Sequence, residues 1–157
     1  MTEVRKRSKL PGELGESVDR ALIPGDDIIY ELVTYRGHGL VVTHEHLLLV
    51  VGGVLAGLKA HEQHIHRLAY DEIISIDIEP EKPGCFWVFG LPQLDLKITA
   101  VDPAKQDPRW NTLTVDFMKL SAAVKLACQV HERIGRRKQE DALTEAARQS
   151  DIEHGTA

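Results

Sequence analysis

The chain opens with apolar residues at helical spacing and then changes to an alternating pattern. Leu14, Val18 and Leu22 recur every four residues, which places them on one face of a short helix. Pro24 and Gly25 follow and are typical of a helix end and a turn. The pattern therefore predicts a short leading helix before the first strand.

From residue 28 onward, apolar residues recur at every second position in short runs that turns separate. Ile74, Ile76 and Ile78, for example, alternate with polar residues and are expected to share one buried face. Strands are predicted at residues 28–35, 40–43, 47–51, 72–79, 85–89, 94–99 and 112–117.

A helical period returns at the end of the chain. It predicts an amphipathic helix of about four turns. Its apolar stripe comprises Leu120, Val124, Ala127, His131 and Ile134. Seven short antiparallel strands followed by one helix predict a mainly β (α+β) sandwich or barrel, capped by the C-terminal helix. Residues 136–157 are highly charged and are interpreted as a tail, a helix extension or a disordered segment.

Several short motifs, in a fixed order, carry a family resemblance. LIPGD at residues 22–26 precedes the first strand, VVT at 41–43 is followed after three residues by LLLV, and AYDEIISI occupies 69–76. A glycine hairpin, GVLAGLK, lies between them at 53–59. The chain resembles the bacterial pleckstrin-homology-like family, small domains of seven antiparallel strands and a C-terminal helix. The resemblance implies a PH-like domain over residues 22–135, preceded by a flexible basic arm and short helix at 1–21.

The chain departs from that family at His46, which stands where an arginine is usual and puts any contact of that arginine in doubt. It also lacks the tryptophan that classical eukaryotic members carry in the last helix. Around the first two strands, where classical phosphoinositide binders carry a basic cluster, the sequence offers only Arg36 and His38. Recognition of inositol phosphates needs several Lys and Arg donors, so no specific phosphoinositide is expected as a ligand.

The stretch HEQHIH at residues 61–66 invites comparison with a zinc motif. A zincin needs histidines at positions i and i+4 of a helix, whereas His61 and His64 are three apart and no helix is indicated. On a strand, His64 and His66 would share one face, with Ile65 on the other. Two imidazoles need further ligands to make a metal site. His64 and His66, with His44 and His46 as the further ligands, are therefore weak candidates for a metal site. The two pairs are expected to lie apart, so a polar strand face is preferred and no metal or cofactor is expected.

Composition excludes several classes of function. The 157 residues carry a net charge of −5, which gives no general attraction to nucleic acid. Neither a nucleophile elbow nor a phosphate-binding loop is found, so the protein is expected not to be an enzyme. The start lacks the apolar core of a signal peptide, and a cytoplasmic location is expected.

Cys85 and Cys128 have apolar neighbours and are expected to be inert buried thiols.

Two groups of residues are candidates for contact with a partner. The predicted strand at 85–89 is apolar on both faces, so Phe86, Trp87 and Phe89, together with the loop residue Trp110, are assigned to an interaction surface. Arg5, Lys6 and Arg7 are assigned to contact with anionic lipid. The preferred function is a non-enzymatic module for protein–protein contact or homo-oligomerisation. A peripheral membrane or lipid-binding domain is the alternative, and a histidine-based metal-binding protein ranks third.

Overall fold

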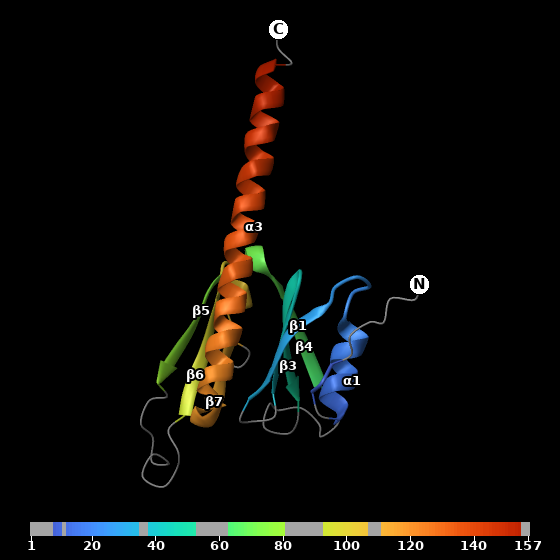
Figure 1. Cartoon of the computed structure of the whole chain (residues 1–157), viewed down its shortest axis with the longest axis vertical. Helices are drawn as coiled ribbons and strands as arrows, with labels where there is room; N and C mark the ends of the chain where they lie inside the picture. The colour runs from blue at the N-terminus through green and yellow to red at the C-terminus, as the bar shows by residue number, and fades with distance from the viewer. Residues whose placement is uncertain are drawn as a thin grey trace.

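The computed structural model describes residues 8–10, 12–34, 38–52, 63–80, 93–106 and 111–154 (Figure 1). The helices are α1 (Gly12–Ala21) and α3 (Leu120–His154), with short 3-10 turns η2 (Tyr70–Glu72), η4 (Pro103–Lys105) and η5 (Phe117–Lys119). The strands are β1 (Ile28–Val33), β2 (Gly39–Thr43), β3 (His46–Gly52), β4 (Gln63–Ala69), β5 (Ile73–Pro80), β6 (Gln93–Ala100) and β7 (Thr112–Asp116).

The strands form two antiparallel sheets. One has the order β1-β2-β3-β4 and the other β5-β6-β7. Seven strands followed by a helix confirm the predicted fold class. Within the described residues the two sheets stay separate, so the arrangement is a sandwich and not a closed barrel. The predicted strand at 85–89 lies outside the described residues, whereas most of the histidine stretch belongs to β4.

The main core lies between the two sheets and α3, which runs beside both of them in Figure 1. Each buried aliphatic side chain contributes roughly 1.5–3 kcal/mol relative to exposure. Representative members of this core are Leu40 and Leu47 from the first sheet, Ile76 and Leu96 from the second, and Leu126 and Val130 from α3.

A second core covers the outer face of the four-stranded sheet. Val18 and Leu22 from the α1 region pack there against Val41, Leu48 and Val50. The sheet is thus covered on both faces, which explains why every residue of β2 is buried. The leading helix, predicted from its four-residue period, is confirmed and forms one layer of the fold.

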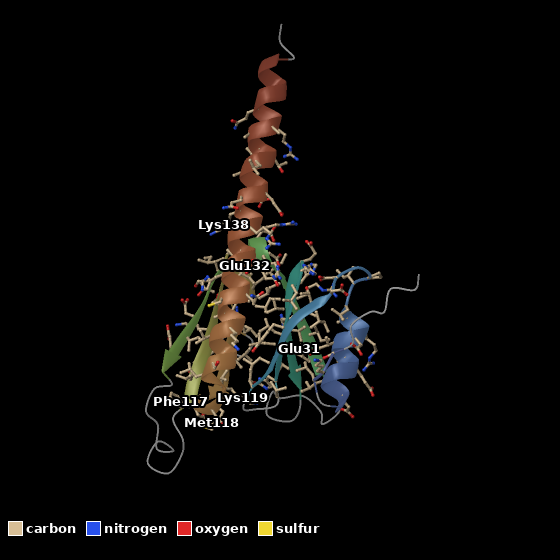
Figure 2. The ribbon with its side chains drawn as sticks, in the orientation of Figure 1. Glu31, Phe117, Met118, Lys119, Glu132 and Lys138 are labelled. Atoms are coloured by element: carbon tan, nitrogen blue, oxygen red, sulfur yellow. The ribbon has the colours of Figure 1, made fainter. Side chains whose placement is uncertain are left out.

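The segment before α1 is held against β1. Glu31, labelled in Figure 2, accepts hydrogen bonds from the backbone N–H of Lys9 (2.9 Å) and the hydroxyl of Ser8 (2.5 Å). Leu10 is buried in the second core. The chain is therefore ordered against the sheet before α1 begins.

The predicted face of β5 is wrong at one residue. Ile73 and Ile76 are 1% exposed, but Ile74 is 53% exposed. The pairing with β6 shifts register between Ile73 and Ser75, which indicates a β-bulge. A bulge adds one residue to a strand and reverses the alternation on one side of it, and sequence alternation alone does not reveal it.

The predicted stripe of α3 is also partly wrong. Val124 is 43% exposed and His131 is also exposed, whereas Ala123, Leu126 and Val130 are fully buried. Two neighbouring stripes of this helix satisfy steps of three and four, and packing against two sheets selects one of them.

Helix α3 is much longer than four turns. It runs for 35 residues, and Figure 1 shows its C-terminal half projecting beyond both sheets. Every residue from Gly135 to Gln149 is exposed. Residues 136–154, for which three alternatives were open, continue the helix. None of the described helices is both long and apolar enough to cross a membrane.

The bulge in β5 makes a testable prediction. Ile76→Ala should lower the free energy of unfolding by about 2–5 kcal/mol, because it opens a cavity in the main core. The matched control Ile74→Ala should cost under about 1 kcal/mol, because that side chain is largely in water. Urea denaturation measures both values. Equal losses would contradict the bulged register.

Candidate functional site

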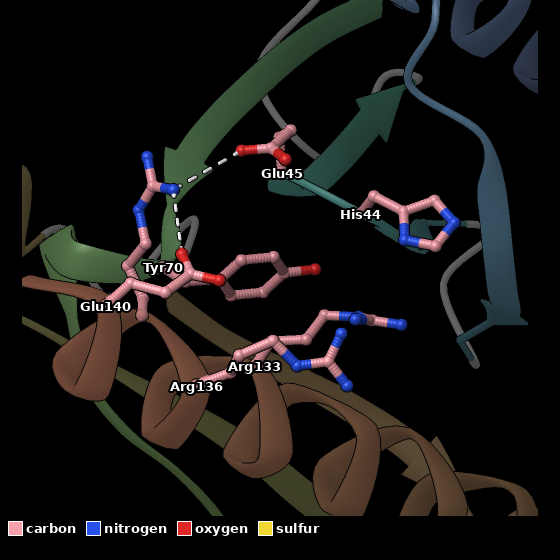
Figure 3. A pocket seen from close by; sticks show the side chains of 7 residues that line it. His44, Glu45, Tyr70, Arg133, Arg136 and Glu140 are labelled. Carbon is pink, nitrogen blue, oxygen red and sulfur yellow. Dashed lines mark hydrogen bonds and ion pairs between the residues drawn. The ribbon is translucent and has the colours of Figure 1, made fainter.

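A pocket lies where α3 leaves the sheets, with a volume of about 100 Å³. It is bounded by the turn between β2 and β3, by the start of η2, and by one face of α3 (Figure 3). The residues that line it are His44, Glu45, Tyr70, Arg133, Arg136, Arg137 and Glu140.

A buried carboxylate holds the β2–β3 turn in place. Asp26 is 6% exposed and accepts hydrogen bonds from Thr43 Oγ1 (2.7 Å) and from the backbone N–H of Glu45 (3.2 Å). The Nδ1 atom of His46 lies 3.1 Å from the same carboxylate. Gly25, just before Asp26, has a φ of 89°, a conformation that favours glycine. The motif at 22–26 thus places a carboxylate under the turn.

Tyr70 ties the start of η2 to the same turn. Its hydroxyl lies 2.8 Å from the carbonyl oxygen of Thr43 and 2.9 Å from that of His46, and it can donate to either. Burial raises the pKa of Tyr70 well above its usual value. Tyr70 is therefore neutral at physiological pH and serves as a structural donor.

Two of the three arginines at the pocket have carboxylate partners. Arg137 Nη1 lies 3.8 Å from Glu45 and 3.4 Å from Glu140, the two contacts drawn as dashed lines in Figure 3. Arg136 Nη2 lies 3.0 Å from Glu132, one turn earlier on the helix. Both glutamates that line the pocket are therefore near an arginine already.

Arg133 differs from both. Its side chain is only 8% exposed, and its Nε atom is buried without a hydrogen-bond partner in the described part of the chain. Tyr70 is neutral and cannot balance its charge. A buried N–H donor without a partner is costly, because it has lost its hydration. This side of the pocket is thus suited to accept an anion.

The histidines of β4 follow the predicted pattern in part. His64 and His66 are both exposed and share one face, and Ile65 packs on the other side in the second core, as expected. They pair with Val51 and Leu49, because β4 runs antiparallel along the whole of β3.

The four candidate metal ligands do not converge. His46 pairs with Ala69 at the opposite end of β3 and, by alternation, belongs to the other face of the sheet from His66. His44 lines the pocket beside α3. Across the described ranges, no group of three or more His, Cys, Asp or Glu side chains is placed to hold a metal ion.

All seven predicted contact residues lie outside the described part of the chain. They are Arg5, Lys6, Arg7, Phe86, Trp87, Phe89 and Trp110.

Of the two cysteines that were expected to be buried, Cys85 also lies outside the described residues. Cys128 is exposed, because it lies off the stripe of α3 that packs on the sheets.

Sequence reasoning missed the pocket itself. Arg133 follows Leu126 and Val130 at helical spacing. A charged residue in line with an apolar stripe indicates a buried charge, and this pattern could have pointed to Arg133. The contact between His46 and Asp26 joins residues 20 positions apart, and no local sequence pattern predicts it.

Comparison with known proteins adds little. No family model matches the chain, and no curated protein matches it. One similar solved structure is a crystal structure of a DUF1696 family protein with a pleckstrin-homology domain, from Shewanella loihica PV-4. It is 19% identical, has a TM-score of 0.46, and the alignment covers 82% of this chain and 95% of that chain.

The hydroxyl of Tyr70 yields a prediction for stability. Tyr70→Phe should lower the free energy of unfolding by about 1–2 kcal/mol, because two buried carbonyls lose their shared donor. Tyr30→Phe is the matched control, since its hydroxyl makes no hydrogen bond to the described residues. Denaturant titration compares the two, and an equal effect would argue against the role of the Tyr70 hydroxyl.

Glu72, at the end of η2, yields a prediction for pH dependence. Its carboxylate accepts hydrogen bonds from the ammonium of Lys105 and from the backbone N–H of Ala69 (3.1 Å). The Lys105 hydrogen bond, followed by the backbone one, holds the pKa of Glu72 below its usual 4.5. A carboxylate whose pKa is lower in the folded protein than in the unfolded chain stabilises the fold at pH values above the unfolded-state pKa. That stability is lost as the pH falls through the folded-state pKa.

We expect Glu72→Gln to lower Tm modestly at neutral pH, because water screens a partly exposed pair. The difference from the wild type should shrink as pH falls below 4.5. Glu79→Gln, at an exposed ion pair with Lys97, controls for the loss of a surface charge. Calorimetry at several pH values measures the three proteins, and a pH-independent difference would contradict the assignment.

Proposed function

We propose that this protein is a non-enzymatic interaction module that pairs with a second copy of itself through the projecting segment of α3, residues 138–154. The observation that supports this most is the exposed apolar stripe on that segment. Ala142, Leu143, Ala146 and Ala147 share one helix face, and Leu143 is 71% exposed.

A helix that extends into water gains little from its own sequence. Isolated helices of this length are marginal, and most helical stability in proteins comes from packing an apolar face. The projecting segment has such a face beyond the sheets of its own domain. A partner that covers the stripe would supply the missing packing.

The order of charges along the segment favours an antiparallel second copy. Arg136, Arg137 and Lys138 lie at its base, and Figure 2 shows Lys138 where α3 rises past the sheets. Glu140, Asp141 and Glu145 follow, and beyond Arg148 the sequence continues with Asp151 and Glu153. In an antiparallel pair, the basic base of one helix faces the acidic end of the other. A parallel pair would place like charges together.

The expected pairing is weak. The segment spans roughly 25 Å of helix, and small alanine side chains bury little area. An interface of that size falls below the roughly 1,200 Å² of standard stable complexes. Dimerisation should therefore depend on protein concentration.

Sedimentation equilibrium over a range of concentrations tests the proposal. The mass should rise from 17.5 kDa towards twice that value as concentration increases. Leu143→Asp should abolish the rise, because it places a charge in the stripe. Thr144→Asp is the matched control, since it adds the same charge off the stripe and should keep the association.

Two outcomes count against the helix pairing. A strict monomer at every concentration would remove self-association altogether. Dimers that survive Leu143→Asp but are lost in Trp87→Asp would move the interface to the segment at 85–89. Circular dichroism of each variant checks that the fold is retained.

A further inference from the structure

We propose that the pocket at the base of α3 binds a phosphate group, held by Arg133 together with Arg136 and His44. This inference does not depend on self-association, because the pocket faces the β2–β3 turn, whereas the apolar stripe proposed for the dimer, from Ala142 to Ala147, lies further along α3.

The argument starts from Arg133. The residue is more than nine-tenths buried, lines the pocket, and has a buried Nε atom without a hydrogen-bond partner among the described residues. The two glutamates in the pocket wall lie within 4 Å of Arg137. Arg136 is paired with Glu132, so Arg133 is the pocket arginine without a carboxylate partner among the described residues, and its positive charge is left unbalanced beside a buried donor. An anion in the pocket would balance that charge.

The donors come from two opposite sides. Figure 3 shows Arg133 and Arg136 reaching from α3 into the gap below the turn that carries His44. Guanidinium groups bind oxyanions with two parallel N–H donors. A tetrahedral phosphate offers oxygens to groups on several sides, whereas a carboxylate has only two oxygens in one plane. A volume of about 100 Å³ suits one such group.

The test compares melting temperatures of the full chain in inorganic phosphate and in chloride of equal ionic strength. A ligand that binds the folded state raises Tm. The wild type should gain several degrees in phosphate, and acetate should give a smaller gain. Arg133→Met should lose the gain, whereas Arg148→Met, an exposed arginine on the same helix, should keep it.

Arg133→Met also distinguishes binding from a purely structural role. In chloride it should melt higher than the wild type, because the buried charge is replaced by an apolar chain of similar length. A lower Tm in chloride would indicate that Arg133 supports the fold by other contacts and would count against the proposal. The proposal would be overturned if the wild type melted no higher in phosphate than in chloride. It would also be overturned if Arg133→Met kept the gain in Tm that phosphate gives the wild type.

A second variant covers the case in which Arg133→Met does not fold. Arg136→Gln changes a largely exposed side chain and should weaken phosphate binding by about tenfold, measured by calorimetric titration. Unchanged affinity in this variant would overturn the assigned donor set.

The phosphate group could belong to a soluble molecule or to a lipid headgroup. Cosedimentation with phosphatidylcholine vesicles containing phosphatidic acid separates the two sources. Binding that is lost in Arg133→Met assigns the site to a lipid headgroup. Binding to free phosphate without cosedimentation assigns it to a soluble phosphate compound.

Discussion

Helix α3 packs one apolar face against both sheets, and the rest of the molecule depends on that contact. In the described residues the two sheets remain separate, so neither closes a core by itself. Leu126 and Val130 are fully buried between them and join the two sheets into one core. The single helix therefore serves as the third wall of the sandwich.

Two further features follow from this packing, because a helix is a rigid element. The stripe that carries Leu126 and Val130 continues through Arg133, so the same rotation that buries the core residues buries this guanidinium. The helix then continues past the end of the sheets (Figure 1). The pocket and the projecting segment are thus both consequences of how α3 is seated.

The β2–β3 turn completes the pocket from the other side. Asp26 and Tyr70 reach this turn from distant parts of the chain and bond to its backbone and side chains. Buried polar groups that are fully hydrogen-bonded fix local geometry strongly. The turn therefore offers a rigid wall opposite the arginines, which is what a preorganised binding site requires.

The sequence by itself determined the class and order of the elements. Alternating and helical periods report which face of an element is apolar, and that information is local. They predicted the leading helix, most of the strands and the terminal helix, and they placed His64 and His66 on one face of a strand.

Only the tertiary structure decided the rest. The bulge that exposes Ile74 depends on pairing with β6, and the stripe of α3 was selected by two sheets at once. His46 and Asp26, which are in contact, are remote from each other in the chain. The burial of Arg133 likewise depends on segments that are remote from α3 in the sequence. Periodicity cannot report such contacts, because they depend on how whole elements pack and not on the order of residues within one of them.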